Sequence, residues 1–98
     1  MVKGLQQQTV KNIESILNLL REAPPVGIHL RGISNALGLN PFTVSRIVDY
    51  YLVPFIEIKE YNEFGVKAKL IRLKAGKEMT IAADVLRYLA LKERIKST

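Results

Sequence analysis

The sequence predicts one α+β domain that is mainly helical. Three stretches with apolar residues at helical spacing come first, two strand-like runs follow, and another helical stretch ends the chain. A length of 98 residues suits one domain with one hydrophobic core. The apolar share of 48% and the charged share of 24% are typical of a folded domain and differ from those of a disordered chain.

The composition excludes several kinds of chemistry. The chain has no cysteine, so it holds no disulfide, zinc knuckle, iron–sulfur site or cysteine nucleophile. Its one histidine, His29, starts the second predicted helix, where we expect a capping or surface role. No cluster of side chains has metal-ligand spacing, no glycine-rich phosphate loop is present, and no nucleophile has a nearby base. We therefore expect no enzyme activity, no metal and no cofactor, and the sequence gives no sign of a small-molecule ligand.

Membrane attachment is not expected either. The longest apolar run, residues 50–56, is far shorter than the roughly 20 residues of a spanning helix. The N-terminus lacks the apolar segment of a signal peptide. We expect a cytoplasmic protein, associated with the nucleoid or, if viral, with the cytoplasm of the host.

The net charge of +6 is concentrated in the last third of the chain. Residues 1–63 carry six Lys or Arg and six Asp or Glu, whereas residues 64–98 carry nine and three. A one-sided basic field favours a polyanion such as nucleic acid as partner. The alternative is a solvated basic surface that only keeps the protein soluble.

The first helix is expected over about residues 5–22. Its apolar residues recur at i, i+3, i+4 and i+7, as on the buried face of an amphipathic helix. They are Val10, Ile13, Ile16, Leu17 and Leu20. Thr9 is a candidate N-cap, with an earlier start at Leu5 as the alternative. The run Ala23-Pro24-Pro25 ends this helix because proline lacks a backbone donor, and Gly27 then permits a tight turn.

Two short helices with a sharp turn between them are expected next. The apolar residues of the first are Leu30, Ile33 and Leu37. Gly38 supplies the positive φ of a helix end, and Leu39 tucks under the turn. Asn40 is then an N-cap, with Pro41 as the first helical residue.

The helix that starts at Pro41 is expected to end at Pro54. Its buried face is formed by Val44, Val48 and Tyr51, with Ile47 half-buried beside them.

A β-hairpin is expected after this helix. Residues 55–61 alternate between apolar and polar, Asn62-Glu63-Phe64-Gly65 contains turn-forming residues, and residues 66–73 form a second strand. Leu70, Ile71 and Leu73 do not alternate, which predicts a bulge or a second apolar contact.

The central segment resembles the helix-turn-helix of winged-helix transcriptional regulators. An apolar-plus-small pair, Ile33-Ser34, precedes the turn Leu37-Gly38-Leu39, and the cap Asn40 and the string Thr43-Val44-Ser45-Arg46 follow. The resemblance covers about residues 10–78 and is to the small archaeal or archaeal-virus type, MarR-like in layout. It implies a winged helix-turn-helix with a three-helix core, a β-hairpin wing and a long C-terminal helix. It also implies transcription regulation through binding to double-stranded DNA.

The resemblance makes residues 41–53 a recognition helix in the major groove. It makes residues 56–73 a basic wing on the DNA backbone or in the minor groove. The residues expected to bind DNA are Arg31, Phe42, Thr43, Ser45, Arg46, Lys67 and Lys69.

These residues have different expected roles. Arg46 contacts guanine or a phosphate, and the hydroxyls of Thr43 and Ser45 contact phosphates or bases. Phe42 contacts a thymine methyl or, alternatively, packs on the wing or the edge of the core. Asp49 repels phosphate and so marks the limit of contact. The lysines of the hairpin and Arg31 bind phosphates.

The last helix is expected over residues 75–96. It carries two apolar stripes, one of which is formed by Met79, Ala82, Leu86 and Leu89. The second contains Ile81, Val85, Tyr88 and Ile95, with Leu91 beside them. Two stripes predict two partners, so we expect a homodimer through residues 79–95, with Met79, Ala82, Leu86 and Leu89 as candidate interface residues and the choice between the two stripes left open. In such a dimer the recognition helices lie roughly 34 Å apart and bind a pseudo-palindrome. One broad stripe buried within the chain is the alternative.

A winged helix also serves in some proteins as a protein-interaction or RNA-binding module. Fold alone does not separate these functions. The basic, hydroxyl-rich start of the expected recognition helix favours DNA.

Overall fold

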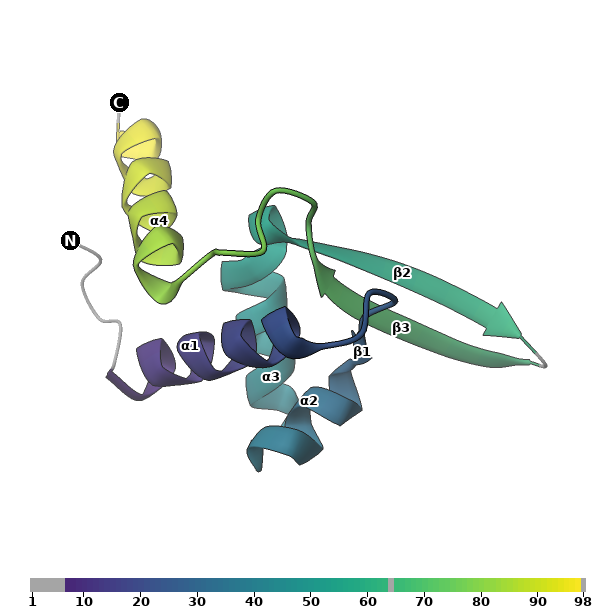
Figure 1. The fold of residues 1–98 in the computed structure, drawn as a ribbon. Helices are drawn as coiled ribbons and strands as arrows, with labels where there is room; N and C mark the ends of the chain where they lie inside the picture. Colours follow the sequence, from purple (N-terminus) through teal and green to yellow (C-terminus); the bar gives the residue numbers. More distant parts are fainter. Residues whose placement is uncertain (1–6, 64, 98) are drawn as a thin grey trace.

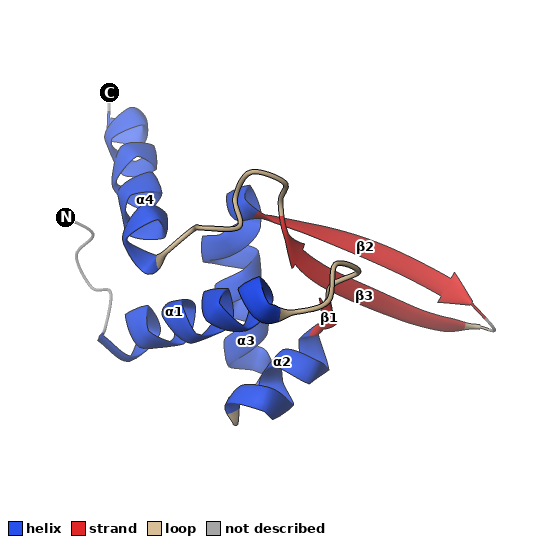
Figure 2. Ribbon diagram, viewed as in Figure 1, coloured by secondary structure: helices blue, strands red, loops and turns tan. Residues whose placement is uncertain are grey.

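The computed structural model describes residues 7–63 and 65–97, in which helices pack around the base of a small antiparallel sheet (Figures 1 and 2). The helices are α1 (Gln7–Glu22), α2 (Leu30–Leu37), α3 (Pro41–Ile47) and α4 (Ala82–Ser97). The strands are β1 (Ile28–His29), β2 (Ile56–Glu63) and β3 (Val66–Leu73), in the order β1-β3-β2. This arrangement confirms the predicted α+β class. Among the described residues, no helix is long and apolar enough to cross a membrane.

Helix α1 buries the predicted stripe and ends where the prolines begin. Ile13, Ile16, Leu17 and Leu20 lie in the core. The prediction of Thr9 as N-cap is wrong, because the helix already includes Gln7, and Leu5 lies outside the described residues. Gly27 turns the chain with φ +102°, and a Cβ at this position would lie 2.8 Å from the carbonyl oxygen of Ile71. The turn therefore needs glycine both for its backbone angle and for its close approach to β3.

The turn between α2 and α3 confirms the predicted caps. Gly38 has φ +66°, and the carbonyl of Ser34 accepts its N–H together with that of Leu39. The buried hydroxyl of Ser34 donates to the carbonyl of Leu39, so one small residue holds both ends of the turn. The side chain of Asn40 accepts the N–H of Phe42 at 2.8 Å, with Pro41 in the first turn of α3.

The helical path continues beyond α3 through a π-helical turn (Val48–Leu52) and a 3₁₀ turn (Val53–Phe55). The predicted end at Pro54 is therefore wrong, since the 3₁₀ turn accommodates a residue without an N–H in its first positions. The wider π turn advances by a smaller angle per residue and brings Leu52 into line with Val44 and Val48. Leu52 is fully buried, whereas Tyr51 is only half-buried.

Ile47 is also buried rather than half-buried as predicted. Both α1 and α2 contact α3, so a wider part of its surface is covered than one stripe.

The hairpin of β2 and β3 pairs without interruption from Ile56↔Leu73 to Glu63↔Val66. Of the two expected outcomes, a bulge or a second apolar contact, the bulge is therefore absent. Ile71 and Leu73 share the face that packs on the helices, whereas Leu70 lies on the other face, opposite His29 of β1. Strand β1 was not predicted, because two residues between a turn and a helix carry no periodic signal. Phe64 of the predicted turn lies outside the described residues.

Helix α4 begins at Ala82 instead of the predicted Ala75. Residues 74–80 instead form two successive turns, in which Lys77 N–H donates to Lys74 O and Thr80 N–H to Lys77 O. The carboxylate of Asp84 then accepts the N–H of Ile81 at 3.0 Å and caps the helix. Figure 1 shows α4 on one side of the domain and the hairpin arm reaching out on the other.

Candidate nucleic-acid interface

The outward face of α3 is open to solvent. Phe42 is 80% exposed and Arg46 lies one helical turn further along the same exposed face. Thr43 and Ser45 are half-buried on the flanks of this face, as predicted. The exposure of Phe42 contradicts the alternative in which it packs on the wing or the core edge. α3 thus presents an aromatic ring, a guanidinium and two hydroxyls away from the protein.

A shallow groove runs along the second half of this face. It is lined by Ser45, Arg46, Asp49, Tyr50 and Tyr51. The hydroxyl of Ser45 donates to the carboxylate of Asp49 at 3.3 Å, so the acidic group that lines the groove is hydrogen-bonded to a residue one turn earlier. The Tyr50 ring is 71% exposed and meets the Tyr51 ring edge-on at 4.9 Å. We name this surface, with Phe42, the α3 face.

A second groove lies between the start of α2 and the outer half of β3. Its charged residues are Arg31 on the helix side and Lys67 and Lys69 on the strand side, and His29 also lines it. All four side chains are exposed. The pairing of β1 with β3 brings these segments together, because it fixes His29 opposite Leu70. We name this surface the basic groove.

The two lysines of the basic groove lie on one side of the hairpin. Residues two apart on a strand point the same way, so Lys67 and Lys69 project side by side with their Cα atoms about 7 Å apart. Lys69 also makes an ion pair with Glu60 of β2 at 3.7 Å, and both side chains are largely exposed. A pair of this kind is worth about 0–1 kcal/mol, so Lys69 exchanges it readily for another anion.

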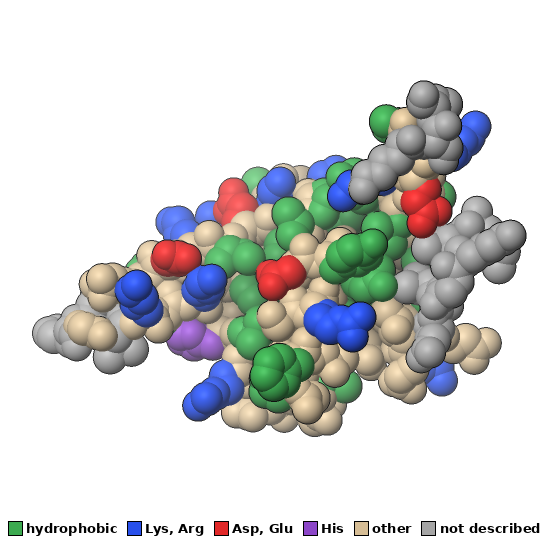
Figure 3. Space-filling model, turned by 180° about the vertical axis from the view of Figure 1, so that it is seen from behind, with side chains coloured by type: hydrophobic (Ala, Val, Ile, Leu, Met, Phe, Trp, Pro, Cys, Tyr) green, Lys and Arg blue, Asp and Glu red, His purple; other side chains and the backbone are tan. Residues whose placement is uncertain are grey.

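Figure 3 shows the side of the molecule that carries α3, which lies at the back in Figure 1. The histidine side chain (purple) lies near the hairpin, with Lys and Arg side chains (blue) above and below it. Hydrophobic (green), acidic (red) and further basic side chains follow across the middle of the domain. The basic groove and the α3 face are therefore presented on one side of the protein.

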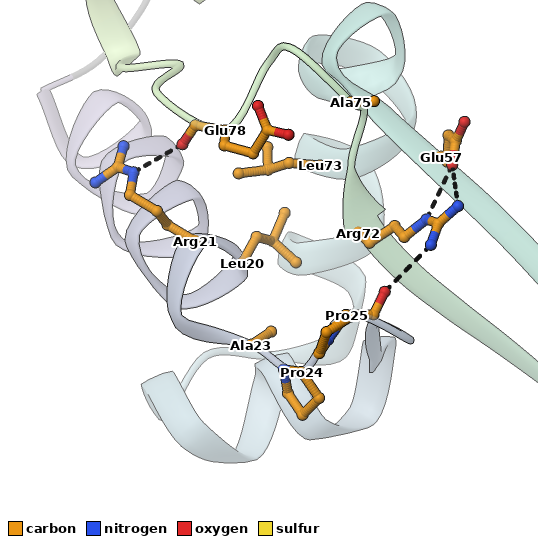
Figure 4. Close-up of a pocket in the computed structure, with 10 residues that line it drawn as sticks. All are labelled: Leu20, Arg21, Ala23, Pro24, Pro25, Glu57, Arg72, Leu73, Ala75 and Glu78. Carbon is orange, nitrogen blue, oxygen red and sulfur yellow. Dashed lines mark hydrogen bonds and ion pairs between the residues drawn. The ribbon is translucent and has the colours of Figure 1, made fainter.

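Two other arginines are used within the fold. The guanidinium of Arg72 pairs with Glu57 at 2.7 Å and donates to the carbonyl of Pro25 at 3.2 Å. That of Arg21 donates to the carbonyls of Glu78 at 3.0 Å and Thr80 at 2.7 Å. Both lie at a crevice of about 350 Å³ (Figure 4). Arg21 thus anchors the loop after β3, and Arg72 links β2 to the turn after α1. Protein acceptors hold both guanidinium groups of this crevice, so we do not include it in the candidate interface.

The residues predicted for the dimer interface differ in their exposure to solvent. Ala82 and Leu89 are buried in the chain's own core, and Leu86 is half-buried. Met79 is 80% exposed but precedes α4, so it does not continue a helical stripe. The four residues therefore do not form one continuous stripe: Ala82 and Leu89 pack within the chain together with Val85 of the second expected stripe, where α4 contacts α1 and the π turn.

Sequence analysis did not identify two residues of the candidate interface. His29 occupies the N-cap position of α2 but its side chain makes no capping hydrogen bond, and it lines the basic groove instead. Tyr50 lies four residues after Arg46, lines the same groove and is exposed. Within the described residues, no group of three or more His, Asp or Glu side chains is placed to hold a metal ion.

Comparison with known proteins gives no match: no family model, no curated protein and no solved structure is significantly similar to this chain.

Proposed function

We propose that this protein binds double-stranded DNA as a winged-helix regulator of transcription. In this proposal α3 and its continuation are the recognition helix, and the β2–β3 hairpin is the wing. The observation that carries it is the pairing, on one side of the molecule, of an exposed helix start bearing Phe42 and Arg46 with the basic groove.

The α3 face has the chemistry of base recognition. An α-helix fits the major groove of B-DNA, and its N-terminal residues reach the base edges in helix-turn-helix proteins. The guanidinium of Arg46 matches the two acceptors of guanine, and the ring of Phe42 matches a thymine methyl group. Neither side chain has to leave a described hydrogen bond or ion pair to make these contacts.

The basic groove has the chemistry of phosphate recognition. Arg31, Lys67 and Lys69 supply three positively charged side chains. Neutralising phosphates with such side chains releases counterions, which gives affinity that does not depend on sequence. The spacing of about 7 Å between the lysines corresponds to about two steps of the 3.4 Å rise per nucleotide.

Titration of labelled random-sequence duplex DNA, followed by fluorescence anisotropy, tests this proposal. Arg46 and the three basic-groove cations give at most four phosphate contacts per chain, hence a slope of about −3.6 for log K against log salt. Raising the salt from about 50 mM to about 200 mM then weakens binding by about 150-fold. Duplex and single-stranded RNA of the same sequence serve as comparison ligands.

Tighter binding to RNA, or no binding to either nucleic acid at the lower salt concentration, contradicts the proposal. The second result leaves a protein-interaction module, for which the exposed rings of Phe42 and Tyr50 are suitable anchors.

A further inference from the structure

His29 is the only histidine of the chain, and it lines the basic groove. It occupies the N-cap position of α2, but its side chain makes no capping hydrogen bond there. The residue is exposed, so its imidazole is accessible to a ligand of the groove. None of the DNA contacts proposed above uses this side chain.

The pairing of β1 with β3 fixes the place of His29 among basic residues. His29 lies opposite Leu70, so its Cα atom is about 6 Å from that of Lys69, the neighbour of Leu70 in β3. Arg31 follows in the first turn of α2. Figure 3 shows the histidine side chain with Lys and Arg side chains above and below it. A phosphate backbone that lies along the groove therefore passes close to the imidazole.

The charges around His29 are mostly positive. They come from α2 and from both strands of the hairpin: Arg31, Lys59, Lys67, Lys69 and Arg72. The described carboxylates of β2 already have partners, since Glu57 pairs with Arg72 at 2.7 Å and Glu60 with Lys69 at 3.7 Å. A protonated His29 thus adds a fourth positive charge to the basic groove, and the anion that suits it comes from outside the chain.

We propose that His29 contacts a DNA phosphate in its protonated form and so makes binding to DNA tighter as the pH falls. This inference rests on the proposed binding of double-stranded DNA. Imidazole ordinarily changes its charge between about pH 5 and pH 8, and only its charged form donates from both nitrogens. A phosphate nearby favours this charged form because the two charges are opposite.

The direction of the pH dependence follows from this coupling. Binding of phosphate and binding of the proton strengthen each other, so affinity for DNA is highest at the lower end of the imidazole range and declines as the ring loses its proton. Carboxyl, ammonium and guanidinium side chains ordinarily titrate well outside this range. The terminal amine ordinarily titrates near about pH 8, so a variant without His29 is the necessary reference.

One additional phosphate contact sets the size of the effect. It adds about −0.9 to the slope of log K against log salt and tightens binding by about 8-fold at about 0.1 M salt. Uptake of one proton per chain permits a change of up to about tenfold per pH unit. The whole effect is therefore expected between about pH 5.5 and about pH 7.5.

Anisotropy titrations of random duplex DNA at these two pH values, over a series of salt concentrations, test the proposal. The wild-type chain is expected to bind about 8-fold more tightly at the lower pH, with a slope steeper by about 0.9. His29→Gln is expected to show neither difference. His29→Arg is expected to bind at both pH values as the wild-type chain does at the lower one. Ser15→His combined with His29→Gln is the matched control, because it keeps one imidazole but places it on the exposed side of α1.

Nuclear magnetic resonance follows the protonation of His29 directly, because the chain has one histidine. At about pH 7, addition of duplex DNA to the wild-type chain is expected to move the Cε1–H signal toward its position in the protonated ring. An imidazole that lies on the surface without contacting phosphate keeps its signal unchanged.

Equal affinity of the wild-type chain for DNA at both pH values overturns the inference. So does a pH dependence that is undiminished in His29→Gln, or an unchanged Cε1–H signal on addition of DNA. These results leave the proposed DNA binding intact, whereas absence of DNA binding at either pH in low salt contradicts the proposed function itself.

Discussion

Replacing Lys67 and Lys69 together with alanine isolates the electrostatic part of the proposed DNA binding. Both side chains are exposed on one side of the hairpin, and neither contributes to the core. The one described ion pair that is lost, Lys69 with Glu60, contributes at most about 1 kcal/mol because it is largely solvated. The variant is therefore expected to fold normally.

The size of the effect follows from the number of charges removed. Each phosphate contact contributes about −0.9 to the slope of log K against log salt, so the double variant flattens the slope by about 1.8 units if both lysines contact phosphate and by about 0.9 if one does. At about 0.1 M salt, two contacts correspond to about 60-fold weaker binding. The ranking of DNA sequences is expected to stay the same, because phosphate contacts carry no base information.

Fluorescence anisotropy titrations over a series of salt concentrations measure both quantities. Lys74→Ala with Lys77→Ala is the matched control, since it removes the same charge from the loop after β3. An unchanged slope in the Lys67/Lys69 variant refutes the reasoning and leaves these lysines as solvated surface residues. A changed ranking of sequences refutes it differently, because the hairpin then reads bases or groove width.

Four further results are expected. Arg46→Ala weakens binding to a selected sequence by about 1–3 kcal/mol and reduces sequence preference; an equal loss on random duplex DNA assigns Arg46 to phosphate contact. Glu60→Gln releases Lys69 and tightens DNA binding by up to about 5-fold in low salt, whereas weaker binding in the same titration argues against a role for Lys69. Gly38→Ala lowers the free energy of unfolding in urea by about 1 kcal/mol, and Gly27→Ala lowers it by about 3 kcal/mol. Both glycines have a positive φ, but of the two Gly27 alone has a backbone oxygen 2.8 Å from the new Cβ. Equal losses in the two variants contradict the close approach of Gly27 to β3. Arg21→Met costs about 1–2 kcal/mol through loss of its hydrogen bonds to the loop before α4, and more than Arg31→Met does; the same stability for both variants refutes this anchoring role.

Local signals in the sequence predicted much of the fold. The prolines after α1, Gly38 and Asn40 act within a few residues of themselves, and each has the structural role expected of it. Periodicity identified the buried faces of α1 and α3, because the spacing of apolar residues along an amphipathic helix is itself a local property of the sequence.

Features that depend on distant contacts were not predicted. Strand β1 forms because Ile28 and His29 pair with Ile71 and Leu70 of β3, which are distant in the sequence. Helix α4 starts later than predicted because Arg21 holds the loop before it through hydrogen bonds. The π turn buries Leu52 in place of Tyr51, and no pattern in the sequence predicts this turn. The buried side of α4 combines residues of both predicted stripes, Ala82 and Leu89 with Val85, and this division depends on the neighbours of α4 rather than on its own spacing.

The same distinction applies to the candidate interface. Spacing on α3 identified Phe42 and Arg46 as outward-facing, which the structure confirms. Spacing did not place Arg31 beside Lys67 and Lys69, since that juxtaposition depends on the pairing of β1 with β3.

Selection of bound sequences from a random pool of DNA duplexes tests the central claim most directly. Wild-type protein and the Arg46→Ala variant are carried through the same rounds at the same salt concentration. Sequence-specific binding through α3 predicts that the wild-type protein enriches one common sequence and that the variant loses preference at a defined base pair of it. A pool that stays random with the wild-type protein, or the same enriched sequence at undiminished strength with the variant, contradicts recognition of DNA by this helix.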